Sequence, residues 1–155
     1  MTRETFERYI ETIDSLQEDE DRVRTKEIAK ELKVKEPSVT EMLRKLKKKN
    51  LVKYEPYKGT ILTEKGQRLA KDLTKKHSTL SDFLKILGVN EENAEEDACK
   101  VEHVVSTETM NKLGEFLRFI QESPEEPTWL EHYNHFIKTG EHPECDKREK
   151  KESQK

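Results

Sequence analysis

The sequence predicts a mainly α-helical protein that contains one short β-hairpin. Three observations support this fold class: apolar residues recur at helical spacing along most of the chain, only 5 Gly and 5 Pro occur in 155 residues, and apolar residues make up 31% of the chain against 41% charged. So polar a chain cannot build one thick core, but it can form thin helical layers that a partner subunit helps to cover. Sandwiches, barrels and nucleotide-binding α/β folds are not expected.

The first part of the chain carries the pattern of three helices. Apolar side chains along one helix face predict a first helix over residues 3–18. Thr25 is a candidate N-cap for a short second helix, and Pro37 suits the first turn of a third helix that continues to Leu46. The second and third helices are too short to be stable alone, so packing against the first helix must hold them.

A β-hairpin is expected after the third helix. Residues 51–55 and 60–62 predict two short strands around the turn 56–59, and Thr63 is a candidate N-cap for the next helix. The order helix, helix, turn, helix, hairpin is that of a winged helix-turn-helix. We therefore expect a DNA-binding domain of this kind over residues 1–63.

Basic residues gather on the third helix and the hairpin. Residues 42–58 hold seven Lys or Arg against one acidic residue, a balance of +6 within a chain of −3. A Lys-rich helix is usually a solvated face, but in this layout phosphate contacts need Lys and Arg at these places, and base edges are reached from the first turns of the recognition helix. The candidate DNA-binding residues are Pro37, Ser38, Thr40, Glu41, Arg44, Lys45, Lys48, Lys53 and Lys58.

The second part of the chain predicts further helices. Apolar stripes indicate a long helix over residues 64–88, ended by a glycine, and another helix over 107–121. Between them, Ala94, Ala98 and Val101 mark the inner side of a third helix. Three thin helices carry more apolar surface than they can cover internally, which indicates a dimerisation unit.

Four potential ligands fall on one helix face in this part of the chain. Glu95, Cys99, Glu102 and His103 are spaced i, i+4, i+7 and i+8. A thiolate, carboxylates and an imidazole together suit a first-row transition metal such as iron, nickel or zinc. The alternative is an ordinary polar helix face with one buried Cys, and this segment alone favours that alternative.

Two more candidates lie on other helices. His77 shares an apolar stripe with Leu73 and Leu80, where a lone His is more often a core residue than a ligand. Glu11 lies with Glu7 on the outer face of the first helix, where solvation is the default expectation. Spacing along the chain does not show whether these residues meet.

The C-terminal segment holds another group of potential ligands. Its members are His132, His135, His142 and Cys145. Their spacing could suit zinc. The competing interpretation is an amphipathic helix packed by Trp129, Tyr133 and Phe136, followed by a tail with incidental ligands, and we prefer this second interpretation.

Several stretches of the chain resemble the diphtheria toxin repressor family of iron- and manganese-dependent regulators, in its short, two-domain form. They are residues 9–11, residues 37–40 together with 51–59, and residues 97–106, with Lys76-His77 as a further match. The likeness covers about residues 3–121. The helix and hairpin part alone would be generic, whereas the run Cys-Lys-Val-Glu-His with His77 at its distance is specific.

The resemblance implies a metal site. Glu102 and His103 match ligands of both the iron and the manganese branch, and Cys99 matches the iron branch. His77 matches a ligand of the second metal position, and Glu11 matches a carboxylate ligand of the manganese branch. The candidate metal ligands are therefore Glu11, His77, Glu95, Cys99, Glu102 and His103.

Some of these positions depart from the family pattern. Glu95 stands where the iron branch has a histidine ligand, and Ser81 stands where it has a Glu. Arg8 stands where the family has a Met or Asp ligand, and a guanidinium cannot bind a metal. The first helix is therefore expected to contribute through Glu11 or Glu7 instead, unless Arg8 itself replaces the metal charge.

The chain is predicted to divide into three parts. Residues 1–63 form the winged helix-turn-helix, residues 64–140 form an α-helical metal-binding and dimerisation domain, and residues 141–155 form a disordered charged tail. No stretch of about 18 apolar residues occurs, no apolar signal region begins the chain, and two Cys are too few for a disulfide scaffold. A cytoplasmic location follows as the expectation.

Residues and resemblance together predict a homodimeric, metal-dependent transcriptional repressor rather than an enzyme. The expected cofactor is a divalent transition metal, Fe2+ first and Mn2+ next, and the expected partner is a double-stranded DNA operator of metal-homeostasis genes, with no membrane and no small organic substrate. One alternative is a winged-helix regulator without metal control, which responds to redox at Cys99 or to a protein partner. A metal enzyme or carrier is less consistent with the +6 region.

Overall fold

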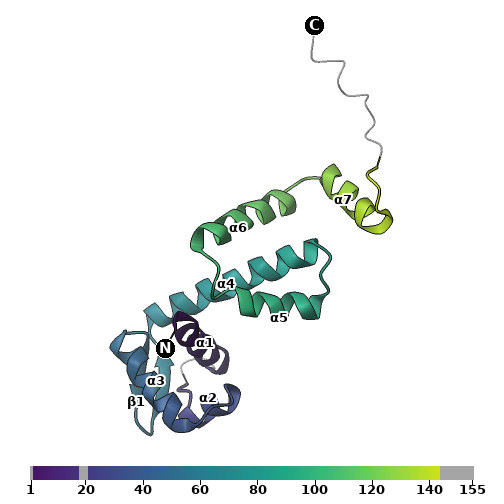
Figure 1. Ribbon diagram of the computed structural model, residues 1–155. Coiled ribbons are helices and arrows are strands. Elements are labelled where there is room, and N and C mark those ends of the chain that lie inside the picture. Colours follow the sequence, from purple (N-terminus) through teal and green to yellow (C-terminus); the bar gives the residue numbers. More distant parts are fainter. Residues whose placement is uncertain (1, 18–20, 144–155) are drawn as a thin grey trace. The chain divides into compact units, whose positions relative to one another are not determined.

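The computed structural model describes residues 2–17 and 21–143, and over these ranges the fold is mainly α-helical (Figure 1), as expected. The elements in chain order are α1 (Arg3–Leu16), α2 (Thr25–Glu31), α3 (Glu36–Lys48), β1 (Val52–Glu55), β2 (Gly59–Leu62), α4 (Glu64–Ile86), α5 (Glu91–Val101), α6 (Thr107–Gln121) and α7 (Thr128–Thr139). The chain divides into two compact units, Met1–Gly114 and Glu115–Lys155, and the division falls within α6.

The core of the first unit is built on α1. Ile10 and Ile13 on its inner face are fully buried, together with Ile28 of α2 and with Leu43 and Leu46 of α3. Helices as short as α2 and α3 are marginal in water by themselves, so this shared apolar core is what holds them in place. The predicted helix-turn-helix arrangement is confirmed.

Two predicted helix starts differ from the structure. Thr25 is the first residue of α2 rather than its N-cap, because Arg24 occupies the cap position. There the carboxylate of Glu27 accepts a hydrogen bond from the backbone N–H of Arg24 at 2.6 Å, which satisfies the helix start from inside the helix. Helix α3 begins at Glu36, one residue before Pro37, so Glu36 belongs to the helix and not to the preceding turn.

The hairpin pairs β1 with β2 antiparallel, with Val52 opposite Leu62. An isolated bridge from Val23 to Thr60 attaches the segment before α2 to the outer edge of β2. Gly59 was expected in the turn but begins β2. Its φ of +96° and the Val23 carbonyl oxygen, which would lie 2.7 Å from an added Cβ, both require glycine there.

Helix α4 begins as the sequence predicts. The Thr63 side chain accepts a hydrogen bond from the N–H of Gly66 at 3.1 Å. An added Cβ at Gly66 would lie 2.1 Å from the carbonyl oxygen of Leu51, so glycine allows α4 to start directly against the hairpin. Helix α4 then packs along both α1 and α5, and it thereby brings the candidate ligand residues of three helices into one region.

A second, smaller apolar cluster lies between α4, α5 and the start of α6. Leu80, Ala98 and Met110 are its buried members. Ala94 and Ala98 are fully buried, as predicted, but Val101 is 37% exposed. Val101 is the last residue of α5, where the chain turns away, so the helical spacing that placed it on the inner side no longer applies.

The second unit contains the rest of α6 and α7. Leu117 is buried, the rings of Phe116 and Trp129 lie 5.8 Å apart, and Phe119 and Ile137 are about 60% exposed. The aromatic packing agrees with an amphipathic helix over this segment, whereas Cys145 and most of the predicted tail lie outside the described residues. Over the described ranges, no helix has the length and apolar content needed to cross a membrane.

Candidate metal centre and DNA-binding surface

Three potential metal ligands from distant parts of the chain meet in the first unit. They are Glu11 of α1 and the two residues directly after α5, Glu102 and His103, whose ligand atoms all lie within 4.8 Å of one another. His103 Nε2 lies 3.5 Å from Glu102 Oε1 and 3.7 Å from Glu11 Oε2. Glu102 is 2% exposed and His103 is 9% exposed, so the group is largely shielded from water.

Glu7 completes this group, one turn before Glu11 on the same face of α1. Its carboxylate accepts a hydrogen bond from His103 Nδ1 at 3.0 Å and another from Arg3 Nε at 2.5 Å. The expectation that Glu7 is solvated is wrong, because its side chain is buried against the end of α5. We call Glu7, Glu11, Glu102 and His103 the His103 cluster.

The carboxylates of the His103 cluster repel one another. Burial raises the pKa of Glu11 to about 7, and the negative charges of Glu102 and Glu7 contribute in the same direction. Burial also raises the pKa of Glu102. A divalent cation would relieve this repulsion, and two carboxylates with an imidazole are ligands that such a cation accepts. The residues present therefore fit a metal ion.

His77 of α4 lies between Glu102 and Glu95. Its Nδ1 is 3.0 Å from Glu102 Oε2 and its Nε2 is 2.7 Å from Glu95 Oε2. Carboxylates only accept hydrogen bonds, so both ring nitrogens carry protons in this arrangement. Burial by itself lowers the pKa of His77, but the hydrogen bonds to Glu95 and Glu102 outweigh it and raise the pKa.

Glu95 is engaged on both of its carboxylate oxygens. Oε1 accepts hydrogen bonds from Ser81 Oγ at 2.5 Å and from Lys85 Nζ at 2.8 Å, while Oε2 faces His77. These bonds, that of Lys85 above all, lower the pKa of Glu95 to about 2. We call His77, Ser81, Lys85 and Glu95 the Glu95 cluster. Glu95 lies outside the group formed by Glu11, Glu102 and His103.

Cys99 lies one turn before Glu102 with an exposed side chain, and it also lies outside that group. The pKa of its thiol is raised, first by desolvation from the surrounding protein and then by the negative charges of Glu102 and Glu11. Arg8 acts on the same thiol in the opposite direction. Cys99 and Arg8 therefore lie in the electrostatic field of the His103 cluster.

Sequence reasoning weighed Glu7 only as a substitute for Glu11 and did not single out Lys85. Both omissions had a signal. Glu7 and Glu11 are four residues apart on one helix, and Lys85 follows His77 and Ser81 at the same spacing on α4. Spacing identifies a shared helix face, but the burial of Glu7 and the salt bridge of Lys85 depend on packing between helices.

The candidate DNA-binding residues lie on α3 and the hairpin. Most are exposed, and Thr40 and Lys45 are half-buried. Lys45 pairs with Glu41 at 2.5 Å, and Lys58 pairs with Glu55 at 2.8 Å. Over residues 2–17 and 21–143, by contrast, Arg44, Lys48 and Lys53 form no ion pair, so their charges face solvent.

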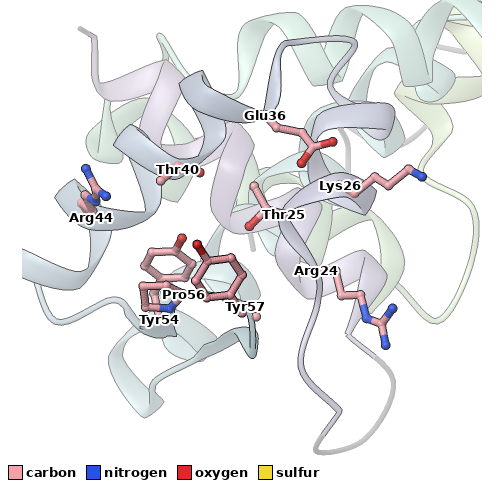
Figure 2. A pocket seen from close by; sticks show the side chains of 10 residues that line it. Arg24, Thr25, Lys26, Glu36, Thr40, Arg44, Tyr54, Pro56 and Tyr57 are labelled. Atoms are coloured by element: carbon pink, nitrogen blue, oxygen red, sulfur yellow. The ribbon is translucent and has the colours of Figure 1, made fainter.

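A cleft opens between α2, α3 and the hairpin (Figure 2) and encloses roughly 370 Å³. Thr40 and Arg44 line one side of it, and Arg24 and Lys26 line the other. Tyr57, fully exposed and in the left-handed backbone region at φ 67°, belongs to the hairpin turn at its floor. The sequence analysis did not select Arg24, Lys26 or Tyr57, because they lie outside the recognition helix.

Comparison with known proteins matches both parts of the chain to one family. Residues 1–60 match the model of the iron dependent repressor, N-terminal DNA binding domain. Residues 63–131 match the model of the iron dependent repressor, metal binding and dimerisation domain.

Individual relatives and solved structures agree with these matches. The chain is 39% identical over 130 residues to the HTH-type transcriptional regulator MntR of Bacillus pumilus, covering 84% of this chain and 90% of that protein. It is 41% identical over 116 residues to an uncharacterised HTH-type regulator of Methanocaldococcus jannaschii, covering 74% and 93%.

The fold is similar to that of a solved structure titled as a manganese-dependent transcriptional repressor in complex with manganese, at a TM-score of 0.65 and 30% identity, covering 77% of this chain and 55% of that chain. The structure of the manganese regulator SloR is similar at a TM-score of 0.63 and 35% identity, with the same coverage. The chain therefore belongs to the iron-dependent, or diphtheria toxin, repressor family, and it is a metal-dependent DNA-binding transcriptional repressor rather than an enzyme.

Proposed function

We propose that this chain is a homodimeric repressor that binds Mn2+ through Glu11, Glu102 and His103, and that the metal-loaded form binds an operator through α3 and the hairpin. The observation that carries this proposal is the meeting of Glu11 with the two residues after α5 within 4.8 Å. Glu11 belongs to the helix on which the DNA-binding core is built, whereas Glu102 and His103 belong to the segment matched to the metal-binding and dimerisation model.

The choice of Mn2+ rests on the donor atoms. Two carboxylates and one imidazole are hard and borderline ligands, and Mn2+ accepts such a set without a thiolate. Cys99 lies outside the group of three, which removes the main argument for the softer metal. The names of the relatives, MntR and a manganese-dependent repressor, support the same choice.

Fe2+ is the second candidate, and Cys99 is the observation that favours it. The thiol lies close enough to Glu102 and Glu11 for their charges to raise its pKa, so a bound cation in the cluster would act on it as well. A Co2+ complex distinguishes the two metals' ligand sets, because a thiolate ligand gives a charge-transfer band in the near ultraviolet. The band is expected only if Cys99 is a ligand, and the variant Cys99→Ser then removes it.

The proposed regulation follows from the place of α1. Ile10 and Ile13 hold α1 in the DNA-binding core, while Glu11 on the same helix faces Glu102. When bound, the ion supplies positive charge to these clustered carboxylates. The chain's own residues then hold α1 against the end of α5, and this arrangement is favoured to the extent that it has the higher metal affinity. Metal and operator thereby strengthen each other's binding.

The proposed contacts with DNA divide by position. The first turns of α3 carry Pro37, Ser38, Thr40, Glu41 and Arg44, which we assign to base edges in the major groove. The lysines of the later turns and of the hairpin are assigned to phosphates, because they supply charge without a fixed hydrogen-bonding pattern. These residues are Lys45, Lys48, Lys53 and Lys58.

The test is a selection of duplexes from a random library, carried out in parallel with Mn2+, with Fe2+ under anaerobic conditions, and with a chelator. Enrichment of one palindromic sequence with Mn2+ and none with the chelator is the expected result. His103→Ala should lose the enrichment, while His135→Ala, which changes an exposed histidine of α7, should keep it. Equal enrichment with the chelator, or by His103→Ala, would contradict the proposal.

A further inference from the structure

Glu7 is a buried carboxylate that the proposed ligand set does not use. Its side chain is 4% exposed, and each of its oxygens has one partner, His103 Nδ1 at 3.0 Å and Arg3 Nε at 2.5 Å. We infer that Glu7 is a positioning residue for His103: it accepts the Nδ1 proton and so leaves Nε2 as the atom that binds the metal. This inference rests on the proposed metal-binding function.

The argument begins with the two faces of the His103 ring. A carboxylate can only accept a hydrogen bond, so Nδ1, which faces Glu7, carries a proton. Nε2 lies 3.5 Å from Glu102 and 3.7 Å from Glu11, beyond good hydrogen-bond length, and it forms none with either. A neutral imidazole has one N–H, so Nε2 then offers a lone pair on the side where the other two ligands lie.

Glu7 is placed to orient the ligand rather than to act as one. Its Oε2 faces the Nδ1 edge of the ring, opposite the nitrogen that meets Glu11 and Glu102. Its Oε1 is held by Arg3, one turn earlier on α1. Carboxylates that accept the remote N–H of a ligating histidine fix its tautomer and ring orientation in many metal sites.

The same contact joins two functions of α1. Glu7 and Glu11 are separated by one helical turn, so α1 contacts the imidazole of His103 at Nδ1 through Glu7 and approaches it at Nε2 through Glu11. A rotation of α1 that moved one carboxylate away would move the other as well. Glu7 therefore presets both the tautomer of His103 and the rotation of α1 before a metal binds.

The experiment reads the tautomer directly. Protein labelled with 15N-histidine is loaded with Zn2+, a diamagnetic probe, and long-range 1H–15N spectra are recorded, with His103 assigned by the signal that His103→Gln removes. The expected wild-type spectrum shows a protonated Nδ1 and a metal-bound Nε2. Glu7→Ala should lose this pattern and weaken Mn2+ binding by about 10–100-fold.

Two further variants separate positioning from a general loss of structure. Glu7→Gln keeps an oxygen that can accept the Nδ1 proton, so it should restore the tautomer and most of the Mn2+ affinity. Glu4→Ala, which removes an exposed carboxylate from the first turn of α1, should change neither. Circular dichroism of each metal-free variant monitors the fold, and the wild-type and Glu7→Gln spectra still decide the question if Glu7→Ala does not fold.

Zn2+ bound to Nδ1 in the wild type would overturn the inference, as would a folded Glu7→Ala with unchanged tautomer and unchanged Mn2+ affinity. Either result would leave the proposed metal site standing. A wild-type protein that binds neither Mn2+ nor Zn2+ at His103 would instead refute the proposed function, and the inference with it.

Discussion

Two polar clusters share one residue, yet they differ in where their positive charge comes from. Glu102 faces His103 with Oε1 at 3.5 Å and His77 with Oε2 at 3.0 Å, so it belongs to the His103 cluster and borders the Glu95 cluster. In the Glu95 cluster, Lys85 supplies a cation 2.8 Å from the carboxylate. In the His103 cluster, buried carboxylates face one another.

The pKa values express this difference. The pKa of Glu95 falls to about 2, mainly through the hydrogen bond from Lys85, whereas burial and neighbouring carboxylates raise the pKa of Glu11 to about 7. A carboxylate with an internal cation is stable as an anion, and one without such a cation needs either a proton or a metal ion. The contrast indicates which of two neighbouring groups of acidic residues and histidines binds the metal.

Removing a ligand from the His103 cluster should have the largest effect. Glu102→Ala or His103→Ala is expected to abolish metal-stimulated DNA binding and to leave a folded dimer. The variants should also lose the metal-dependent gain in unfolding free energy, about 2.7 kcal/mol at a hundredfold excess over the dissociation constant. Fluorescence anisotropy with the selected duplex and thermal unfolding with and without Mn2+ measure the two effects, and normal metal stimulation in both variants would refute the assignment.

The pH dependence of metal binding should show the raised pKa of Glu11. Below about 7 the metal must displace a proton from Glu11, so the apparent Mn2+ affinity should fall by up to about tenfold per pH unit. Titrations of wild type and Glu11→Gln at several pH values test this. A Mn2+ affinity that stays constant from pH 5 to 8 would contradict a raised pKa.

Stability without metal should respond to pH in opposite directions in the two clusters. Folded Glu11 keeps a proton that an unfolded glutamate releases above about 4.5, so its contribution to the unfolding free energy falls as pH rises from 4.5 to about 7. Glu95 has a lowered pKa, so its contribution is present above 4.5 and is lost as pH falls toward about 2. Urea unfolding of Glu11→Gln and Glu95→Gln across this range should show the opposite slopes, and parallel pH curves would remove the contrast.

The same distinction between paired and unpaired charge applies to the DNA-binding surface. Lys53 is exposed, whereas Lys58 pairs with Glu55 at 2.8 Å. Lys53→Ala should reduce the slope of log affinity against log salt by about 0.9 if one phosphate contact is lost. Lys58→Ala should reduce it by less, because binding already has to compete with the ion pair. Equal changes in slope would show that the pairing with Glu55 has no effect on DNA binding.

The smallest effect is expected from the Glu95 cluster. Lys85→Met removes the cation beside Glu95 but no proposed ligand, so Mn2+ affinity should change by no more than about twofold, as for other partly exposed ion pairs. Calorimetric titration of wild type and variant measures the change. A loss as large as that of His103→Ala would place the Glu95 cluster inside the metal centre.

Much of the fold could be predicted because it depends on local patterns. Helical spacing identified α1, α4 and α6, and Thr63 was correctly assigned as an N-cap. The errors arose where a neighbouring residue or a distant contact decides. Glu27 replaces a side-chain cap at the start of α2, and the close approach of Val23 makes Gly59 part of a strand.

The candidate site was predictable only in part. Glu102 and His103 lie in one short run, so their proximity follows from the sequence. The approach of Glu11 does not follow from it, because it depends on how α1 packs against α4 and the end of α5. The expected solvation of Glu7 failed for the same reason, since helical periodicity describes one helix and not the surface that covers it.

The central claim is that the metal binds in the His103 cluster and not in the Glu95 cluster. Anomalous X-ray scattering from crystals of the Mn2+-loaded protein, recorded above the manganese absorption edge, tests it most directly. The account predicts an anomalous peak in contact with Glu11, Glu102 and His103 Nε2, with Lys85 still paired to Glu95. A peak bound by His77 and Glu95 alone, or none beside His103, would contradict it.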